Sequence, residues 1–146
     1  MADVTPIKKL LVANRGEIAR RIMRTAHDMG ISTVAIFAEG DARAPFVNEA
    51  DTAIFLEGRT STETYLDVEK VINACKRSGA DAVHPGYGFL SENEGFAQAI
   101  IDAGIKWIGP SPEVIGLMGD KLSAKNLMTE AGVPTLPAIE INDKLD

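Results

Sequence analysis

The stretch Lys9-Leu10-Leu11-Val12-Ala13-Asn14-Arg15-Gly16 decides the expected fold, because it joins a continuous apolar run to a tight turn. Residues 10–13 show no alternation with polar residues, which is typical of a strand buried on both faces of its sheet. After the turn, Ile18 and Ile22 begin an apolar stripe at helical spacing that ends at Gly30. The stretch therefore predicts a buried strand that leads directly into an amphipathic helix.

The same alternation of strand and helix continues along the chain. Further strands are predicted at residues 33–37, 53–56, 82–83 and 106–108, and further helices at residues 65–77, 91–103, 112–118 and about 124–131. Ser91 and Glu94 fit a capping box, and Ser111 with Pro112 fits a helix start. Helices between buried strands imply right-handed parallel crossovers. We therefore predict an α/β fold, a doubly wound three-layer parallel sheet of about five strands that is Rossmann-like.

Composition narrows the class of protein. The chain has 146 residues, 45% apolar and 25% charged, which is typical of one soluble globular domain. Its net charge of −6 argues against nucleic acid as a partner. No apolar run approaches the roughly 20 residues that span a bilayer, and residues 1–6 lack a signal pattern, so we expect a cytoplasmic protein without membrane contact.

Cys75 is the only cysteine, so an internal disulfide is excluded. It lies at helical spacing with Val68, Val71 and Ile72, which favours a small buried core residue over a reactive thiol. The two histidines, His27 and His84, lie far apart in sequence. The sequence therefore predicts no metal site.

The turn Asn14-Arg15-Gly16-Glu17 occupies the corner where nucleotide-binding folds hold phosphate. A dinucleotide site would require Gly-x-Gly-x-x-Gly, whereas this corner has one glycine, so NAD or FAD binding is disfavoured. Two interpretations stay open. The Asn14 side chain either braces the turn or faces a substrate.

The run His84-Pro85-Gly86-Tyr87-Gly88-Phe89-Leu90-Ser91-Glu92 follows a predicted strand, where open α/β sheets bind ligands. Gly86 and Gly88 permit close approach of a flat ligand or of another backbone segment. Tyr87 and Phe89 either contact that ligand or cap the core. His84 precedes a proline and is therefore expected to be extended, as a hydrogen-bonded strut rather than a catalytic base.

Two further groups of basic residues have two interpretations each. Arg20, Arg21 and Arg24 lie on the polar side of the first helix, where Glu17–Arg21 and Arg24–Asp28 have the spacing of helical ion pairs. This side is either a solvated face or a subunit interface. Lys121 lies at a predicted helix start, where a cation is unfavourable unless an anion is also bound. It is either a phosphate contact or a solvated lysine.

Four segments, in this order and spacing, resemble the N-terminal domain of biotin carboxylase, the ATP-grasp component of biotin-dependent carboxylases. The resemblance covers Lys8 to about Pro137, and the four segments are residues 12–19, 84–93, 107–110 and 117–121. It implies that residues 1–134 form this domain and that residues 135–146 begin a linker to an ATP-grasp region.

The resemblance implies a ligase that carboxylates the biotin ureido nitrogen with bicarbonate, ATP and magnesium. The carboxybiotin would serve an acyl-CoA, pyruvate or related carboxyltransferase. The amino-acid sequences of the segments look closest to those of bacterial acetyl- or propionyl-CoA carboxylases. Lys121 corresponds to the first ATP-binding lysine of the family. Tyr87, Gly88 and Phe89 correspond to a wall of the biotin pocket, and Arg21 and Arg24 to a region of dimer contacts.

The glycine-rich lid, the metal-binding carboxylates and the catalytic base and arginine of the family fall beyond Asp146. We therefore expect no catalytic or metal-binding residue and no tightly bound cofactor here, and no ATP turnover by this chain alone. The expected partners are the remainder of the carboxylase, the biotin carboxyl carrier and the carboxyltransferase, and the full enzyme is expected to be a homodimer. The alternatives are a non-catalytic binding or assembly module for a carboxylase subunit and a nucleotide-binding Rossmann-type domain.

Overall fold

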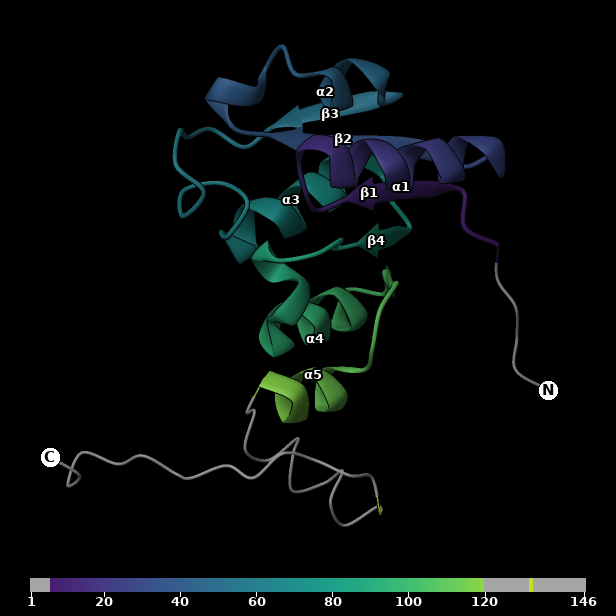
Figure 1. The fold of residues 1–146 in the computed structure, drawn as a ribbon. Helices are drawn as coiled ribbons and strands as arrows, with labels where there is room; N and C mark the ends of the chain where they lie inside the picture. The colour runs from purple at the N-terminus through teal and green to yellow at the C-terminus, as the bar shows by residue number, and fades with distance from the viewer. Residues whose placement is uncertain (1–5, 120–131, 133–146) are drawn as a thin grey trace, which may run out of the picture.

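The computed structural model describes residues 6–119 and Gly132, and within them one parallel sheet carries the fold (Figure 1). Its strand order is β3-β2-β1-β4-β5. The strands are β1 (Lys9–Val12), β2 (Ser32–Phe37), β3 (Thr52–Phe55), β4 (Ala82–His84) and β5 (Lys106–Trp107). The helices are α1 (Gly16–Asp28), α2 (Pro45–Glu49), α3 (Val68–Ser78), α4 (Glu94–Asp102) and α5 (Pro112–Gly119), with two 3₁₀ turns, η1 (Glu39–Asp41) and η2 (Phe89–Glu92). The predicted α/β fold is confirmed.

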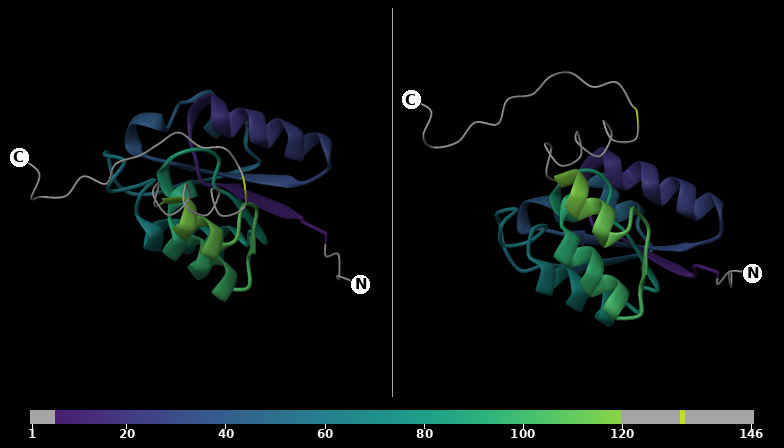
Figure 2. Two further views of the ribbon diagram at one scale, coloured as in Figure 1. Left: turned by 60° about the horizontal axis from the view of Figure 1, so that its bottom comes forward. Right: turned by 90° about the horizontal axis from the view of Figure 1, so that it is seen from below.

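The helices cover both faces of the sheet, as Figure 2 shows from two further directions. Helices α1 and α2 pack on one face, and α3 and α4 pack on the other, with α5 beside α4. The chain builds β1, β2 and β3 outward in one direction and then returns to place β4 on the other side of β1. Because parallel crossovers are right-handed, this return puts the later helices on the opposite face.

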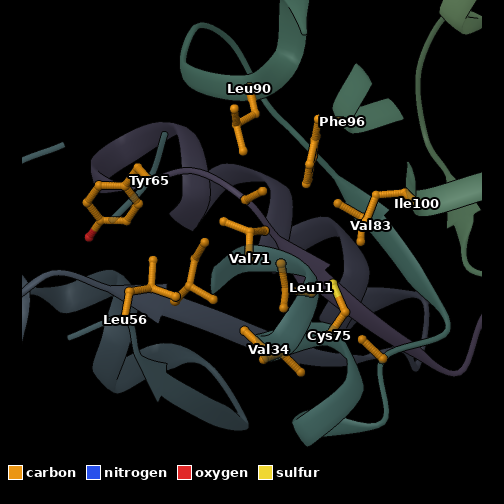
Figure 3. Packing of buried hydrophobic residues seen from close by; sticks show 14 of the residues in the cluster. Leu11, Val34, Leu56, Tyr65, Val71, Cys75, Val83, Leu90, Phe96 and Ile100 are labelled. Carbon is orange, nitrogen blue, oxygen red and sulfur yellow. The ribbon is translucent and has the colours of Figure 1, made fainter. Parts of the chain in front are cut away.

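Alternate residues of each central strand point to the two faces and so enter two cores. Leu11 and Val34 join the cluster under α3 and α4 (Figure 3), whereas Leu10 and Val12 join the cluster under α1. Burial on both faces explains why these strands are apolar throughout. Cys75 lies in the cluster of Figure 3, and its burial raises the pKa of the thiol to about 12, which confirms the predicted core role.

Strand β3 differs from the others. Its sequence is as apolar as theirs, which predicts a strand covered on both faces, yet Ala53 is exposed and Phe55 is 43% exposed. The sheet order explains this, because within the described residues β3 lies at an edge of the sheet and pairs with β2 alone. The Phe55 ring is partly covered by Phe37, which stacks on it at a centroid distance of 5.5 Å.

The predicted capping box is wrong. Ser91 belongs to η2, and α4 instead begins after Asn93, whose side chain accepts a hydrogen bond from the Phe96 amide at 2.8 Å. Likewise α3 begins at Val68 with Asp67 as its cap, not at Tyr65. The start of α5 is confirmed, since the Ser111 hydroxyl accepts from the Val114 amide. Lys121, the predicted helix near residues 124–131 and the predicted linker 135–146 lie outside the described residues.

Candidate functional site at the carboxyl ends of β1 and β4

Two loops meet where the strand order reverses. Strands β1 and β4 are neighbours in the sheet, but the chain leaves them toward opposite faces. In open α/β sheets such a reversal opens a crevice at the carboxyl ends of the two strands, and ligands bind there. The turn that begins at Asn14 follows β1, and residues 85–88 follow β4. Both segments singled out in the sequence therefore lie at the expected ligand edge.

Asn14 ties the two loops together. It is 1% exposed, and its Nδ2 donates to the carbonyls of Pro85, at 2.9 Å, and Tyr87, at 2.7 Å. Its Oδ1 accepts from the Arg15 amide at 2.9 Å. The side chain therefore braces its own turn, as one of the two interpretations predicts, and it also braces the neighbouring loop.

His84 supports the same loop from the β4 side. Its Nδ1 accepts a hydrogen bond from the Gly86 amide at 3.0 Å. The ring is half-buried, and this burial lowers the pKa of His84 from its ordinary value. The neutral ring is the form that accepts at Nδ1, so burial and the hydrogen bond favour the same protonation state. The prediction of a hydrogen-bonded strut is confirmed.

The two glycines of the loop have different surroundings. Gly86 has a φ of 65°, and a Cβ there would lie 2.7 Å from Nδ2 of Asn14. Gly88 has a φ of 70°, and a Cβ there would meet no atom within 4 Å. Gly86 therefore permits the close approach of Asn14, whereas Gly88 leaves bare backbone open to a ligand.

The two aromatic residues of the loop also differ in their surroundings. Phe89, with a φ of 47°, packs its ring on that of Tyr65 at a centroid distance of 5.3 Å and so closes the core. Tyr87 is 78% exposed. Of the two interpretations left open, core capping therefore applies to the partly buried Phe89, and the Tyr87 ring is the one that stands exposed for contact with a ligand.

A groove of about 610 Å³ runs from this loop along α1. Tyr87 and His84 line it at the loop, and Arg21 and Glu17 supply charged side chains from α1. Its remaining lining is mostly apolar and includes Ile18, Ile22 and Met29. An apolar groove with a few polar groups at one end suits a ligand or a protein segment with an apolar face.

The charge pairs of α1 differ from those predicted. Arg20 contacts Glu49 of α2 at 2.8 Å and Glu17 at 3.2 Å. Glu17 therefore pairs with Arg20 rather than with Arg21, and the described residues hold no ion pair between Arg24 and Asp28. Helix α2 lies beside α1, so a partner from outside the helix is available to Arg20.

A cluster of Arg15, Asp41 and Tyr65 lies beside the turn and was not predicted. Arg15 donates to both carboxylate oxygens of Asp41, at 2.7 and 2.6 Å, and the Tyr65 hydroxyl donates to Oδ2 at 2.6 Å. That hydroxyl accepts from the Ala38 amide at 3.0 Å. The Tyr65 hydroxyl points away from the apolar side chains of its cluster (Figure 3). No local sequence pattern predicts that these residues are partners, because they lie more than 20 residues apart.

The cluster shifts the pKa values of its members. The hydrogen bonds from Arg15 hold the pKa of Asp41 below its ordinary value, and the same pair raises the pKa of Arg15. Burial and the hydrogen bond to Asp41 raise the pKa of Tyr65. All three groups therefore keep their ordinary charge at neutral pH, and the cluster is a structural clamp on the turn after β1.

The part of the chain from residue 6 to 119 holds no group of three or more His, Cys, Asp or Glu side chains that is placed to bind a metal ion. None of its helices has the length and apolarity that crossing a bilayer requires.

Solved structures match this fold closely. The biotin carboxylase domain dimer of Hydrogenobacter thermophilus 2-oxoglutarate carboxylase, in complex with MgADP, ADP and bicarbonate, superposes with a TM-score of 0.87. The identity is 48%, and the match covers 92% of this chain and 29% of that one.

Sequence relatives point the same way. The chain is 55% identical over 131 residues to the biotin-dependent acyl-coenzyme A carboxylase alpha3 subunit of Mycobacterium leprae, covering 90% of this chain and 22% of that protein. It is 49% identical over 134 residues to a biotin carboxylase of Halalkalibacterium halodurans, covering 92% of this chain and 30% of that protein. The chain thus spans less than a third of either relative.

The family model for the biotin carboxylase N-terminal domain matches residues 6–115, which is most of the chain and nearly all of its described part. That range includes both loops of the site and all five strands. The chain belongs to the family of biotin carboxylase N-terminal domains.

Proposed function

We propose that this chain is the N-terminal domain of an ATP-grasp biotin carboxylase, with the domain at residues 1–134 and a linker to the ATP-grasp region from residue 135. The complete enzyme is a ligase that carboxylates the ureido nitrogen of biotin with bicarbonate, ATP and magnesium. The match over residues 6–115 carries the proposal. The complex of the Hydrogenobacter relative with MgADP and bicarbonate supports the choice of substrates.

Tyr87, Gly88 and Phe89 form one wall of the biotin pocket in this proposal. A flat ureido ring fits against open backbone beside an aromatic ring, and this loop offers both. Gly88 has free space where a side chain would stand, and the Tyr87 ring is largely exposed. Phe89, packed on Tyr65, anchors the wall to the core.

The remaining functional groups are assigned by their place in the family. Lys121, outside the described residues, is the first ATP-binding lysine. Other parts of the complete enzyme supply the magnesium ligands, the catalytic base and the catalytic arginine. ATP, magnesium and biotin are therefore cofactors and substrates of the complete enzyme, and none binds tightly to residues 1–146 alone.

The partners follow from the same assignment. The complete enzyme is a homodimer, and α1 contributes to the dimer interface through Arg21 and Arg24. Both side chains are exposed in this chain. It acts in the cytoplasm with a biotin carboxyl carrier and a carboxyltransferase. We assign an acetyl- or propionyl-CoA acceptor, and the Mycobacterium leprae acyl-coenzyme A carboxylase subunit supports an acyl-CoA over pyruvate or urea.

Biotin-dependent ATP hydrolysis tests the proposal. The full-length protein, supplied with bicarbonate and magnesium, should hydrolyse ATP faster when free biotin is added, and residues 1–146 alone should not. Adding a separately expressed remainder should restore the activity. Stable binding of residues 1–146 to an intact carboxylase, without such restoration, would instead indicate an assembly module.

A further inference from the structure

We propose that Asn14 is a positioning residue for the biotin-pocket wall: its carboxamide sets where Tyr87 and Gly88 stand. The inference rests on the proposed function, because it assumes that this loop contacts biotin. Asn14 precedes the loop by about 70 residues in the sequence, and the fold brings its side chain into direct contact with the loop.

The hydrogen bonds carry the argument. Both N–H groups of the Asn14 carboxamide are used, one on Pro85 and one on Tyr87, so the loop backbone curls around a single nitrogen. The bond to Tyr87, at 2.7 Å, acts on the residue whose side chain forms the wall. Tyr87 is 78% exposed, so the side chains around its ring do little to position it. The position of Tyr87 therefore depends on the position of Asn14.

Asn14 itself is held by the sheet. Its side chain is buried, and the preceding residue, Ala13, donates a backbone hydrogen bond to the His84 carbonyl at 2.9 Å. The Oδ1 bond to the Arg15 amide orients the carboxamide so that Nδ2 points at the loop. The Asn14 side chain thus transmits the position of the β1 end to the wall, while the His84 ring supports the same loop at Gly86 from the end of β4.

Gly86 completes the arrangement. It lies against the carboxamide so closely that an added Cβ would meet Nδ2 at 2.7 Å and Cγ of Asn14 at 3.0 Å. Its positive φ is a further reason for glycine. Asn14 and Gly86 therefore form a matched pair, in which the carboxamide occupies the space that the missing side chain leaves.

Substitution separates positioning from bulk packing. Asn14→Asp keeps the size and the acceptor for the Arg15 amide, but it replaces the two donors with an oxygen that faces two carbonyl oxygens. Asn14→Ala removes the donors without adding charge. Gly86→Ala disturbs the pair from the loop side, and Gly104→Ala is its control, because Gly104 has a φ of 78° and open space at Cβ.

The test uses steady-state kinetics of the full-length enzyme with free biotin and with ATP as varied substrates. Both Asn14→Asp and Asn14→Ala lose the two hydrogen bonds to the loop, and we expect the KM for biotin to rise about tenfold in each. The KM for ATP should stay within about twofold, since the wall does not hold the nucleotide. Gly86→Ala should act in the same direction, and Gly104→Ala should leave both constants unchanged.

Three results overturn the proposal: an unchanged biotin KM in both Asn14 variants, equal rises in the two KM values, or a fall in kcat alone. The last two are the marks of a merely structural residue. Because KM is a property of each active molecule, a preparation that is partly unfolded still gives it. A wild-type enzyme without biotin-dependent hydrolysis would refute the proposed function itself, and the wild-type measurement alone reveals that.

Discussion

Asp41 joins three segments of the chain through a single carboxylate. It receives two hydrogen bonds from Arg15, which follows β1, and one from Tyr65, which precedes α3, while lying itself in η1. A carboxylate with three donors is well compensated for its loss of water. The cluster therefore ties the turn after β1 to the segments that follow β2 and β3.

Tyr65→Phe should lower the stability of the chain by about 1–3 kcal/mol, because it leaves the Ala38 amide and one Asp41 oxygen short of a partner. Urea unfolding followed by circular dichroism measures this. The other tyrosine is the control: Tyr87→Phe removes an exposed hydroxyl and should change stability by less than about 0.5 kcal/mol. Equal effects of the two substitutions would contradict the role of the cluster.

Acid should weaken the cluster in a defined direction. The hydrogen bonds from Arg15 hold the pKa of Asp41 in the folded chain below 3.8, so folding favours the ionised carboxylate. The resulting stabilisation is complete above pH 3.8 and is lost as the pH falls through the folded-state pKa. Asp41→Asn should therefore be less stable than the wild type at neutral pH, and the difference should shrink below pH 3.8. Urea titrations at several pH values measure it, and a constant difference would contradict this.

At the scale of elements, the start of α4 shows how a loop changes a helix boundary. The 3₁₀ turn η2 comprises Phe89–Glu92, so Ser91 lies within the turn. The helix cap is therefore Asn93, two residues after Ser91. The capping box predicted from Ser91 and Glu94 has the right spacing but the wrong register. The 3₁₀ turn that precedes the helix thus decides which residue becomes the cap.

Asn93→Ala should destabilise the chain by about 0.5–2 kcal/mol, because the Phe96 amide loses its side-chain acceptor at the first turn of α4. Ser91→Ala should cost less than about 0.5 kcal/mol, because Ser91 does not cap the helix. Thermal and urea unfolding of the two variants compare them directly. A larger loss of stability in Ser91→Ala than in Asn93→Ala would instead support the capping box predicted from the sequence.

At the scale of the whole molecule, the sheet order decides which loops meet. Because β4 lies beside β1, the turn at Asn14 and the loop at Tyr87 are neighbours although about 70 residues separate them. The same topology places α1 on one face and α3 on the other. The site and the proposed dimer face therefore share α1, through Arg21 in the groove and Arg24 on the outer side.

Arg24→Glu should weaken self-association of the full-length enzyme about tenfold or more, since it reverses a charge on the proposed dimer face. Sedimentation velocity over a concentration series measures the dimer dissociation constant. Arg77→Glu is the control, because Arg77 is exposed on α3, on the opposite face of the sheet. Equal dissociation constants for the two variants would place the interface elsewhere.

Several features were predictable because their causes are local. Leu11 and Val34 lie in continuous apolar runs, which predicts strands covered on both faces, and Ser111-Pro112 predicts a helix start. The prediction of burial failed for Phe55, since hydropathy does not reveal which strand becomes the edge. The predicted pair of Glu17 and Arg21 is wrong, because Glu17 pairs with Arg20 instead. Arg20 also pairs with Glu49 of α2, a contact between two elements that the spacing within one helix does not predict.

The sequence by itself determined the alternation of strands and helices, the family, and the loop that carries Tyr87 and Gly88. Apolar periodicity and glycines act over short distances, and the order and spacing of the motifs can be read directly along the chain. Only the tertiary structure decided that Asn14 braces this loop, that Asp41 joins Arg15 to Tyr65, and that Phe89 turns inward while Tyr87 stays exposed. The physical reason is that these contacts join residues distant in sequence. Their partners are chosen by the order of the strands in the sheet, which no local pattern encodes.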